Sequence, residues 1–155
     1  PPDGIRSFGP TRAAMYAGRG YVEEANNQLA CIVMIETAEA LENLDEIMST
    51  PGVDAVYIGP ADLAYALGLP PTGDNNDPKH VEAVTRIYEC AKKHNIAAGI
   101  HTGSVEYTTR YLNQGFHMVT LGADNGFMGK AARQDLKAAR QGGGTEKVDP
   151  ESSFY

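Results

Sequence analysis

The 155-residue sequence predicts an α/β fold that is built on a parallel sheet. Four short apolar runs, centred near residues 33, 56, 98 and 119, alternate with segments whose apolar residues follow helical spacing. Each run is nearly continuous in apolar residues, which is typical of parallel strands that are buried on both faces. Strand and helix therefore alternate four times, and this order fits either a small doubly wound sheet or half of an eight-stranded barrel.

The segment before the first strand predicts only short elements. Residues 1–10 are rich in Pro and Gly and predict no regular structure. A short helix is expected over residues 11–17 and a second over residues 21–28, because both segments combine helix-forming residues with apolar side chains. Gly18 and Gly20 separate the two helices.

The first strand is expected over Ile32 to Ile35. Thr37 can cap the helix that follows, since a Thr side chain accepts a hydrogen bond from a first-turn amide. Pro51-Gly52 ends that helix. The second strand follows over residues 53–58, and Gly59-Pro60 then turns the chain.

The remaining elements repeat this alternation. Asp77-Pro78 and Ser104 are helix starts of the kind in which a capping side chain precedes the first turn. The predicted elements are a short helix from Ala61 to near Gly68, a polar loop over 70–77, a helix over 78–94, a strand over 96–100, a helix over 105–113, a strand over 118–121, a helix from Asp124 to about Gln141 and a flexible tail over 142–155.

The end of the first strand favours the barrel over the doubly wound sheet. A doubly wound nucleotide-binding sheet would favour a Gly-rich turn at this place, whereas the chain continues as Glu36-Thr37-Ala38-Glu39. A closed barrel typically needs about 250 residues. We therefore expect residues 1–141 to form the carboxyl-terminal half of a barrel, with the other half before Pro1.

Composition excludes several classes of function. The apolar fraction of 42% and the charged fraction of 21% are those of a globular protein, and no run of 18 apolar residues predicts a membrane span. The net charge of −7 argues against a nucleic-acid partner. The first residues lack the apolar core of a secretory signal, and together these features predict a cytoplasmic protein.

The two cysteines, Cys31 and Cys90, are 59 positions apart. One lies in the first apolar run and the other in a helical pattern, so we expect two buried thiols in a reducing compartment. Without a CxxC or HxxxH spacing, a zinc site has little support in the sequence.

Two carboxylates, Glu36 and Asp62, follow the first two predicted strands. The carboxyl ends of parallel strands meet at one edge, and neighbouring strands lie about 4.8 Å apart, so both acids can reach one ion. Carboxylates without Cys or His suit a hard cation such as Mg²⁺ or Mn²⁺. Taken singly, each acid is more often a helix cap or an ion-pair partner, and the pairing makes the two interpretations about equally good. Side chains alternate along a strand, so Met34 shares a face with Glu36.

The motifs around these acids resemble the HpcH/HpaI aldolase family of class II, metal-dependent aldolases for 4-hydroxy-2-oxo acids, which is related to the citrate lyase β-subunit. The resemblance extends from Pro1 to about Arg140. It rests on Gly4-Ile5-Arg6-Ser7, Met34-Ile35-Glu36-Thr37, Pro51-Gly52-Val53-Asp54, Ile58-Gly59-Pro60-Ala61-Asp62-Leu63 and Leu121-Gly122-Ala123-Asp124. It implies a TIM (β/α)8 barrel of the phosphoenolpyruvate/pyruvate-binding type that assembles into homotrimers or homohexamers.

The resemblance also implies roles for individual residues. Glu36 and Asp62 would be the ligands of Mg²⁺ or Mn²⁺, with Co²⁺ as a further candidate, and the backbone of Ala61 and Asp62 would receive the carboxylate of pyruvate. Many members have Gln where this chain has Met34, and that Gln contacts substrate. The general-base His and the enolate-stabilising Arg of the family would precede Pro1. His101, at the end of the third predicted strand, could face the same opening, although a structural role is favoured.

Three functions remain open from the sequence. The first is a carbon–carbon lyase that uses pyruvate as its enolate component and an aldehyde as the second reactant. The second is a non-catalytic half-barrel that acts as an assembly or binding module, because four strands cannot close a barrel and leave edges for pairing. The third is an acyl-CoA lyase like the citrate lyase β-subunit, for which the only basic cluster is Lys92-Lys93, at a helix end.

Overall fold

A four-stranded parallel sheet forms the centre of the computed structural model, which describes residues 11–142. The strands are β1 (Ile32–Ile35), β2 (Ala55–Ile58), β3 (Ala97–Thr102) and β4 (Met118–Leu121). They lie in the order β1-β2-β3-β4, so every strand pairs with its neighbours in sequence. A doubly wound sheet reverses its strand order at one point, and this sheet has no such reversal. The predicted α/β class is confirmed, and the strand order is that of a barrel segment.

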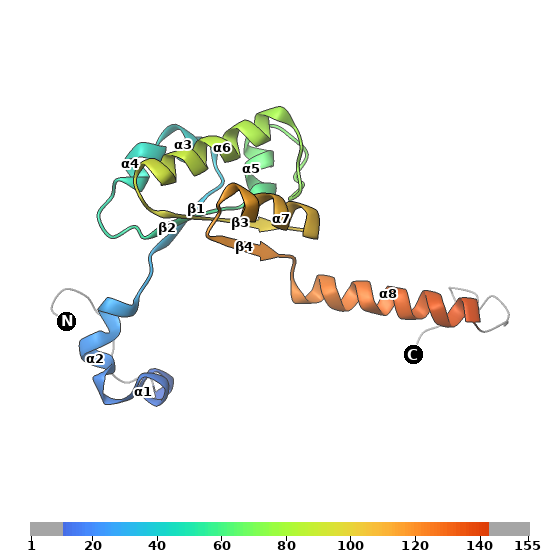
Figure 1. The fold of residues 1–155 in the computed structure, drawn as a ribbon, viewed down its shortest axis with the longest axis horizontal. Coiled ribbons are helices and arrows are strands. Elements are labelled where there is room, and N and C mark those ends of the chain that lie inside the picture. The colour runs from blue at the N-terminus through green and yellow to red at the C-terminus, as the bar shows by residue number, and fades with distance from the viewer. Residues whose placement is uncertain (1–10, 143–155) are drawn as a thin grey trace.

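The helices that follow β1, β2 and β3 pack on one side of the sheet (Figure 1). The covering helices are α3 (Ala38–Glu42), α4 (Leu44–Met48), α5 (Pro60–Ala66), α6 (Pro78–Lys93) and α7 (Val105–Gln114). Side-chain caps start three of them: Thr37 accepts from Ala40 N at 3.1 Å, Asp77 from Lys79 N at 2.9 Å and Ser104 from Tyr107 N at 3.4 Å. The predicted capping residues therefore define the starts of these helices.

The strand register separates two faces of the sheet. Residues paired across parallel strands point to the same side. One row, Ile35–Ile58–Ile100, faces the helices, and each of its residues has no exposed surface. The adjacent row runs Met34–Tyr57–Gly99–Met118 on the opposite side. Met34 is 53% exposed and Met118 is 41% exposed, so among the described residues nothing covers this side, which we call the open face.

The hydrophobic core consequently lies between the helices and one side of the sheet. Each covering helix contributes to it through a buried apolar stripe. The fully buried members are Ile35, Val56, Ile58, Leu63, Ile87 and Ile100. Aromatic residues close one end, where Tyr88 stacks on Phe116 with ring centroids 4.7 Å apart and Tyr111 meets Phe116 edge-on at 5.1 Å.

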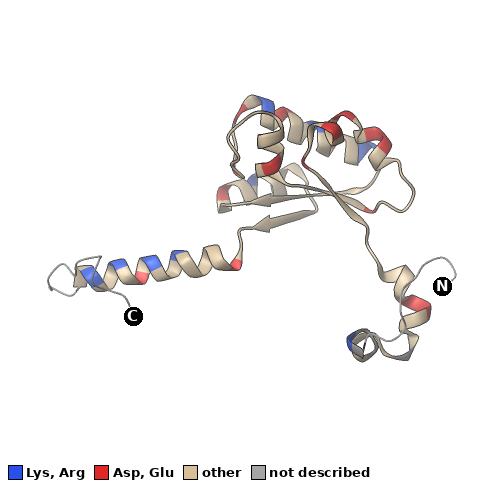
Figure 2. Cartoon of the chain, turned by 180° about the vertical axis from the view of Figure 1, so that it is seen from behind, with Lys and Arg blue, Asp and Glu red and all other residues tan. Residues whose placement is uncertain are grey.

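The terminal elements project from the sheet and its helices (Figure 1). The chain begins with α1 (Thr11–Ala17), a 3-10 turn over Gly18–Gly20, α2 (Tyr21–Glu24) and a 3-10 turn over Ala25–Gln28. It ends with α8 (Asp124–Gly142), which has no buried residue. Figure 2 shows acidic residues spread over the covering helices, whereas α8 carries mostly basic ones. No helix in the described part of the chain is long and apolar enough to cross a membrane.

Several predicted boundaries differ from the structure. The segment over residues 21–28, predicted as one helix, is α2 followed by a 3-10 turn. The helix expected after Thr37 divides into α3 and α4 at Asn43, whose φ of −108° and ψ of 22° interrupt the helical backbone. Strand β2 starts at Ala55, two residues later than predicted. Strand β3 extends to Thr102, because pairing with β4 continues through His101 and Thr102. The expectations for residues 1–10 and for the tail beyond Gly142 lie outside the described residues.

The prediction of two buried thiols is wrong for Cys31. This thiol is free and exposed, whereas Cys90 is free and half-buried. Cys31 precedes β1, an edge strand, and the chain before it leaves the sheet (Figure 1). Its apolar sequence neighbours therefore did not imply burial.

Candidate metal and substrate site at the carboxyl end of the sheet

Glu36 is the first residue after β1, at the carboxyl end of the strand. Its position is fixed from both sides: Ile35 before it is fully buried, and Thr37 after it caps α3. The side chain is half-buried. Alternation along the strand places it on the open face, in line with Met34.

Gly59 makes room for the Glu36 side chain. This glycine follows β2 and is buried. A Cβ at residue 59 would overlap Oε2 of Glu36 and would lie 3.1 Å from Cε of Met34. Glu36 and Met34 therefore both lie over Gly59, and Met34 sits beside the acid as the strand periodicity predicted. Gly99 likewise leaves room for the side chains of Tyr57 and Met118 in the neighbouring strands.

Asp62 lies in the first turn of α5, directly after β2. Gly59 is the N-cap residue and Pro60 is the first helical residue, so Asp62 is not the N-cap that a lone acid at this place would suggest. Its side chain is exposed. The first backbone hydrogen bond of the helix runs from Leu63 N to Gly59 O at 2.9 Å. The amides of Ala61 and Asp62 precede that bond, so the helix supplies them with no acceptor.

His101 also lies on the open face. It pairs with Thr120 in β4 and stands two residues beyond Gly99, so it points to the same side as Tyr57. The side chain is half-buried. Glu36 and His101 therefore share one face, with β2 between their strands. Each of the carboxyl-end candidates comes from the part of the strand or turn that the sequence predicted.

The polar loop over 70–77 is fastened to the same end of the sheet. Asp74 accepts a hydrogen bond from Gly103 N at 2.9 Å, just past β3. Asn76 accepts one from Arg110 of α7 at 3.0 Å. The loop therefore crosses from α5 to α6 beside the ends of β2 and β3.

His80 supports the start of α5, a contact that the sequence did not predict. Its side chain is fully buried, and Nε2 donates to Pro60 O at 2.9 Å. Burial lowers the pKa of His80, while the Pro60 carbonyl and Asp77 act in the opposite direction. The neutral ring therefore holds the first carbonyl of the helix that carries Asp62.

Oxygen donors make the carboxyl end compatible with a hard divalent cation. Glu36 and Asp62 supply two carboxylates from adjacent strand ends, and Gly59 leaves space for one of them. Two protein carboxylates are typical of Mg²⁺ sites, where water and substrate provide the remaining ligands. The only group of three or more His, Cys, Asp or Glu ligands in the described residues lies elsewhere, at Asp45, Cys90 and His94.

Known proteins match most of this chain. The family model described as HpcH/HpaI aldolase/citrate lyase matches residues 1–131. A hydroxypyruvate/pyruvate aldolase of Rhizorhabdus wittichii is 41% identical over 139 residues, which cover 90% of this chain and 55% of the relative. A 4-hydroxy-2-oxo-heptane-1,7-dioate aldolase of Escherichia coli is 34% identical over 153 residues, or 97% of this chain and 57% of the relative.

A solved structure shows the same fold. An HpcH/HpaI aldolase/citrate lyase family protein from Burkholderia cenocepacia superposes with a TM-score of 0.77 at 37% identity, over 90% of this chain and 54% of that one. The chain thus spans about half the length of the curated relatives it matches, as the half-barrel prediction requires.

Proposed function

Because the chain belongs to the HpcH/HpaI aldolase/citrate lyase family, we propose that its full-length gene product is a metal-dependent aldolase. The reaction would form or cleave the carbon–carbon bond of a 4-hydroxy-2-oxo acid, with pyruvate as the enolate component and an aldehyde as the partner. The names of the relatives support this class, since they are aldolases for pyruvate and for hydroxy-oxo acids.

The observation that carries the proposal is the position of Glu36. It leaves β1 on the open face, lies over Gly59 and so reaches the turn that leads to Asp62. We propose that these two carboxylates hold a divalent cation, with Mg²⁺, Mn²⁺ and Co²⁺ as candidates. A bound cation would supply Lewis-acid stabilisation of the enolate oxygen.

The first turn of α5 supplies the group that would orient the substrate. The amides of Ala61 and Asp62 have no acceptor within the helix and would receive the carboxylate of pyruvate. Met34, beside Glu36, would line the pocket with an apolar side chain. His101 shares the face and is a candidate for moving a proton, whereas the general base and the enolate-stabilising Arg implied by the family resemblance would come from sequence before Pro1.

Assembly and location follow from the same resemblance. We propose a cytoplasmic homo-oligomer, either a trimer or a hexamer, with small 2-oxo acids as ligands and no nucleic-acid or membrane partner. The exposed apolar residues of the open face support contact with further protein, because Ile32, Met34 and Met118 are each more than 40% exposed.

The test is Glu36→Ala in the full-length gene product. Metal-dependent release of pyruvate from a 4-hydroxy-2-oxo acid should fall about 100-fold or more, because loss of a direct ligand costs at least as much as loss of its supporting contacts. Glu39→Ala is the matched control, since Glu39 is an exposed acid in the first turn of α3, three residues away. The control should keep the activity of the parent.

A second candidate is the assembly module, which the uncovered sheet face favours. Under that function the full-length product releases no pyruvate, with or without added metal, and Glu36→Ala changes neither assembly nor stability. Metal-dependent release that persists in a folded Glu36→Ala protein would contradict the metal site instead.

A further inference from the structure

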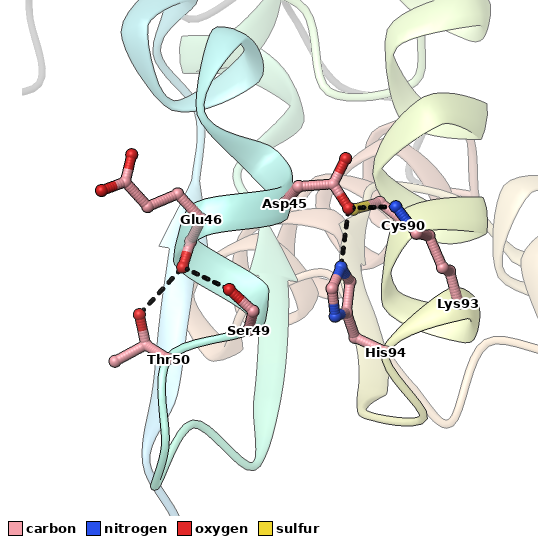
Figure 3. A network of polar contacts seen from close by, with 7 residues as sticks. All are labelled: Asp45, Glu46, Ser49, Thr50, Cys90, Lys93 and His94. Carbon is pink, nitrogen blue, oxygen red and sulfur yellow. Dashed lines mark hydrogen bonds and ion pairs between the residues drawn. The ribbon is translucent and has the colours of Figure 1, made fainter.

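A second group of metal-ligating side chains lies between α4 and α6, on the helical side of the sheet (Figure 3). Asp45 belongs to the first turn of α4, Cys90 to the last turns of α6, and His94 is the C-cap residue of α6. Since α6 runs back toward the start of β3, this group lies near the amino ends of the strands. The candidate aldolase site lies at their carboxyl ends.

The three ligand atoms already converge. Asp45 Oδ1 lies 2.7 Å from His94 Nε2 and 3.8 Å from Cys90 Sγ, and all three atoms lie within 4.8 Å of one another. Ligand atoms around a tetrahedral zinc ion are separated by roughly 3.3 to 3.8 Å, given the usual metal–ligand bond lengths. The group therefore needs only a small widening to enclose an ion.

The scaffold holds these side chains in place. Cys90 and His94 are four residues apart and so lie on one face of α6. That helix is anchored in the core by Ile87 and Ala91, on either side of Cys90. Asp45 is anchored in the same way by Leu44, which precedes it in α4 and is buried. The geometry of the group is therefore set by core packing.

We propose that Asp45, Cys90 and His94 form a second metal site, specific for a borderline-soft transition-metal ion of the Zn²⁺ class. Sulfur, imidazole nitrogen and one carboxylate oxygen are the donors that Zn²⁺ and Co²⁺ prefer, whereas the oxygen-only site at Glu36 and Asp62 suits Mg²⁺ or Mn²⁺. Three protein ligands leave a fourth position for water. Binding through Sγ releases the thiol proton to solvent, and binding through His94 Nε2 requires that the proton which Nε2 shares with Asp45 Oδ1 moves to Nδ1 or to solvent.

Lys93 is the competitor that the ion must displace. Its Nζ lies 2.5 Å from the same Oδ1 of Asp45. The two side chains are 64% and 65% exposed, and exposed ion pairs of this kind contribute little, so the lysine can swing into solvent at small cost. Hydrogen bonds from Lys93 and then His94 lower the pKa of Asp45 to about 2, and an ion would replace both of these contacts at the carboxylate. Burial raises the pKa of the Cys90 thiol, so the ion also competes with its proton.

Cobalt binding to the full-length protein tests the site. We would titrate Co²⁺ into metal-free protein, without a polyhistidine tag, and follow the thiolate-to-cobalt charge-transfer absorption in the near ultraviolet. The parent should develop this band at one equivalent for each chain, and Zn²⁺ should abolish it. Cys90→Ser should lose the band, whereas Cys31→Ser, which removes the exposed thiol, should keep it. Co²⁺ bound by Glu36 and Asp62 gives no such band, because no sulfur lies in that donor set.

Lys93→Gln distinguishes the proposed site from nonspecific binding of Co²⁺ by the Cys90 thiol alone. Without the competing ammonium group, the Co²⁺ affinity read from the band should rise about two- to fivefold. An absent band in the parent, a band that survives in Cys90→Ser, or an affinity that stays equal or falls in Lys93→Gln would each overturn the proposal. Aldolase activity enters none of these readouts, so the two sites are judged separately.

Discussion

His80 is the residue whose protonation is most tightly constrained by its surroundings. The ring is fully buried, and Nε2 is committed to the Pro60 carbonyl at 2.9 Å. Nδ1 is buried and has no partner among the described residues. A proton on Nδ1 would place an unpaired charge inside the protein, so the folded state favours the neutral ring. Asp77 is the charged group that acts on it in the opposite direction.

This constraint predicts a pH dependence of stability. The pKa of His80 is lowered from 6.5 in the folded protein, so between that lowered pKa and 6.5 the unfolded chain binds the extra proton. The free energy of unfolding should therefore fall as the pH drops below 6.5, by at most about 1.4 kcal/mol per pH unit. His80→Gln removes the titrating ring, while its side-chain amide NH can still donate to Pro60 O. The free energy of unfolding of this variant, measured with urea, should therefore fall less between pH 7.5 and pH 5.5 than that of the parent protein.

The control for this measurement is His117→Gln, because His117 is exposed and a Gln oxygen can still accept the hydrogen bond that Ala98 N donates to His117 Nδ1 at 3.3 Å. That variant should retain the pH-dependent change of the parent. An equal loss of stability on acidification in His80→Gln and in the parent would show that other groups account for it.

Residue positions were predictable where they depend on neighbours in the chain. Glu36 follows an apolar strand and precedes a capping Thr, and both features are local, so its place at the carboxyl end could be read directly. The contact of His80 with Pro60 spans 20 residues, and that of His94 with Asp45 spans 49. Such contacts depend on how helices pack, which periodicity alone does not specify. For this reason the Asp45, Cys90 and His94 group was not found in the sequence.

At the level of elements, the segment between β1 and β2 shows how one residue that can end a helix divides a predicted continuous helix in two. The sequence predicted one helix between Thr37 and Pro51, but Asn43 divides it. The Asn43 side chain donates to Glu39 O at 2.8 Å, and its own amide bonds to Glu39 O and Ala40 O at 3.2 Å. The hydrogen bonds of Asn43 therefore end α3 at this residue. The bond from Ile47 N to Asn43 O then begins α4. Both halves bury apolar side chains: Leu41 in α3, and Leu44 and Met48 in α4.

The cap of α3 should be measurable on its own. Thr37→Ala removes the oxygen that accepts from Ala40 N, and the free energy of unfolding should fall by about 1 kcal/mol. Thr37→Ser retains the acceptor and should recover most of this loss. Thr109→Ala, at an exposed position inside α7, is the background control, and denaturant titration measures all three. A loss in Thr37→Ser as large as that in Thr37→Ala would assign the effect to the methyl group of Thr37.

For the whole molecule, the decisive property is that the sheet is covered on one side only. Apolar runs predicted strands that are buried on both faces, yet Ile32 is 45% exposed and Met34 is 53% exposed. The apolar pattern of the strands therefore predicts that both faces of the sheet are buried, whereas residues 11–142 cover only one of them. This agrees with a chain that spans about half of each relative, in which further protein would meet the open face. Both the α/β class and the half-barrel followed from the sequence, and the share of each relative that the chain covers agrees with the half-barrel.

The one-sided core predicts unequal costs for the same substitution on the two sides of the sheet. Met48 is 3% exposed on the helical side, and Met34 is 53% exposed on the open face. In the 155-residue chain, Met48→Ala should lower the free energy of unfolding by about 2 to 5 kcal/mol through lost burial and a cavity. Met34→Ala should cost less than about 1 kcal/mol, because solvent already reaches the side chain. Urea unfolding of both variants checks this difference. Equal costs would mean that Met34 is covered in solution, for example by a second copy of the chain, and the cost would then increase with protein concentration.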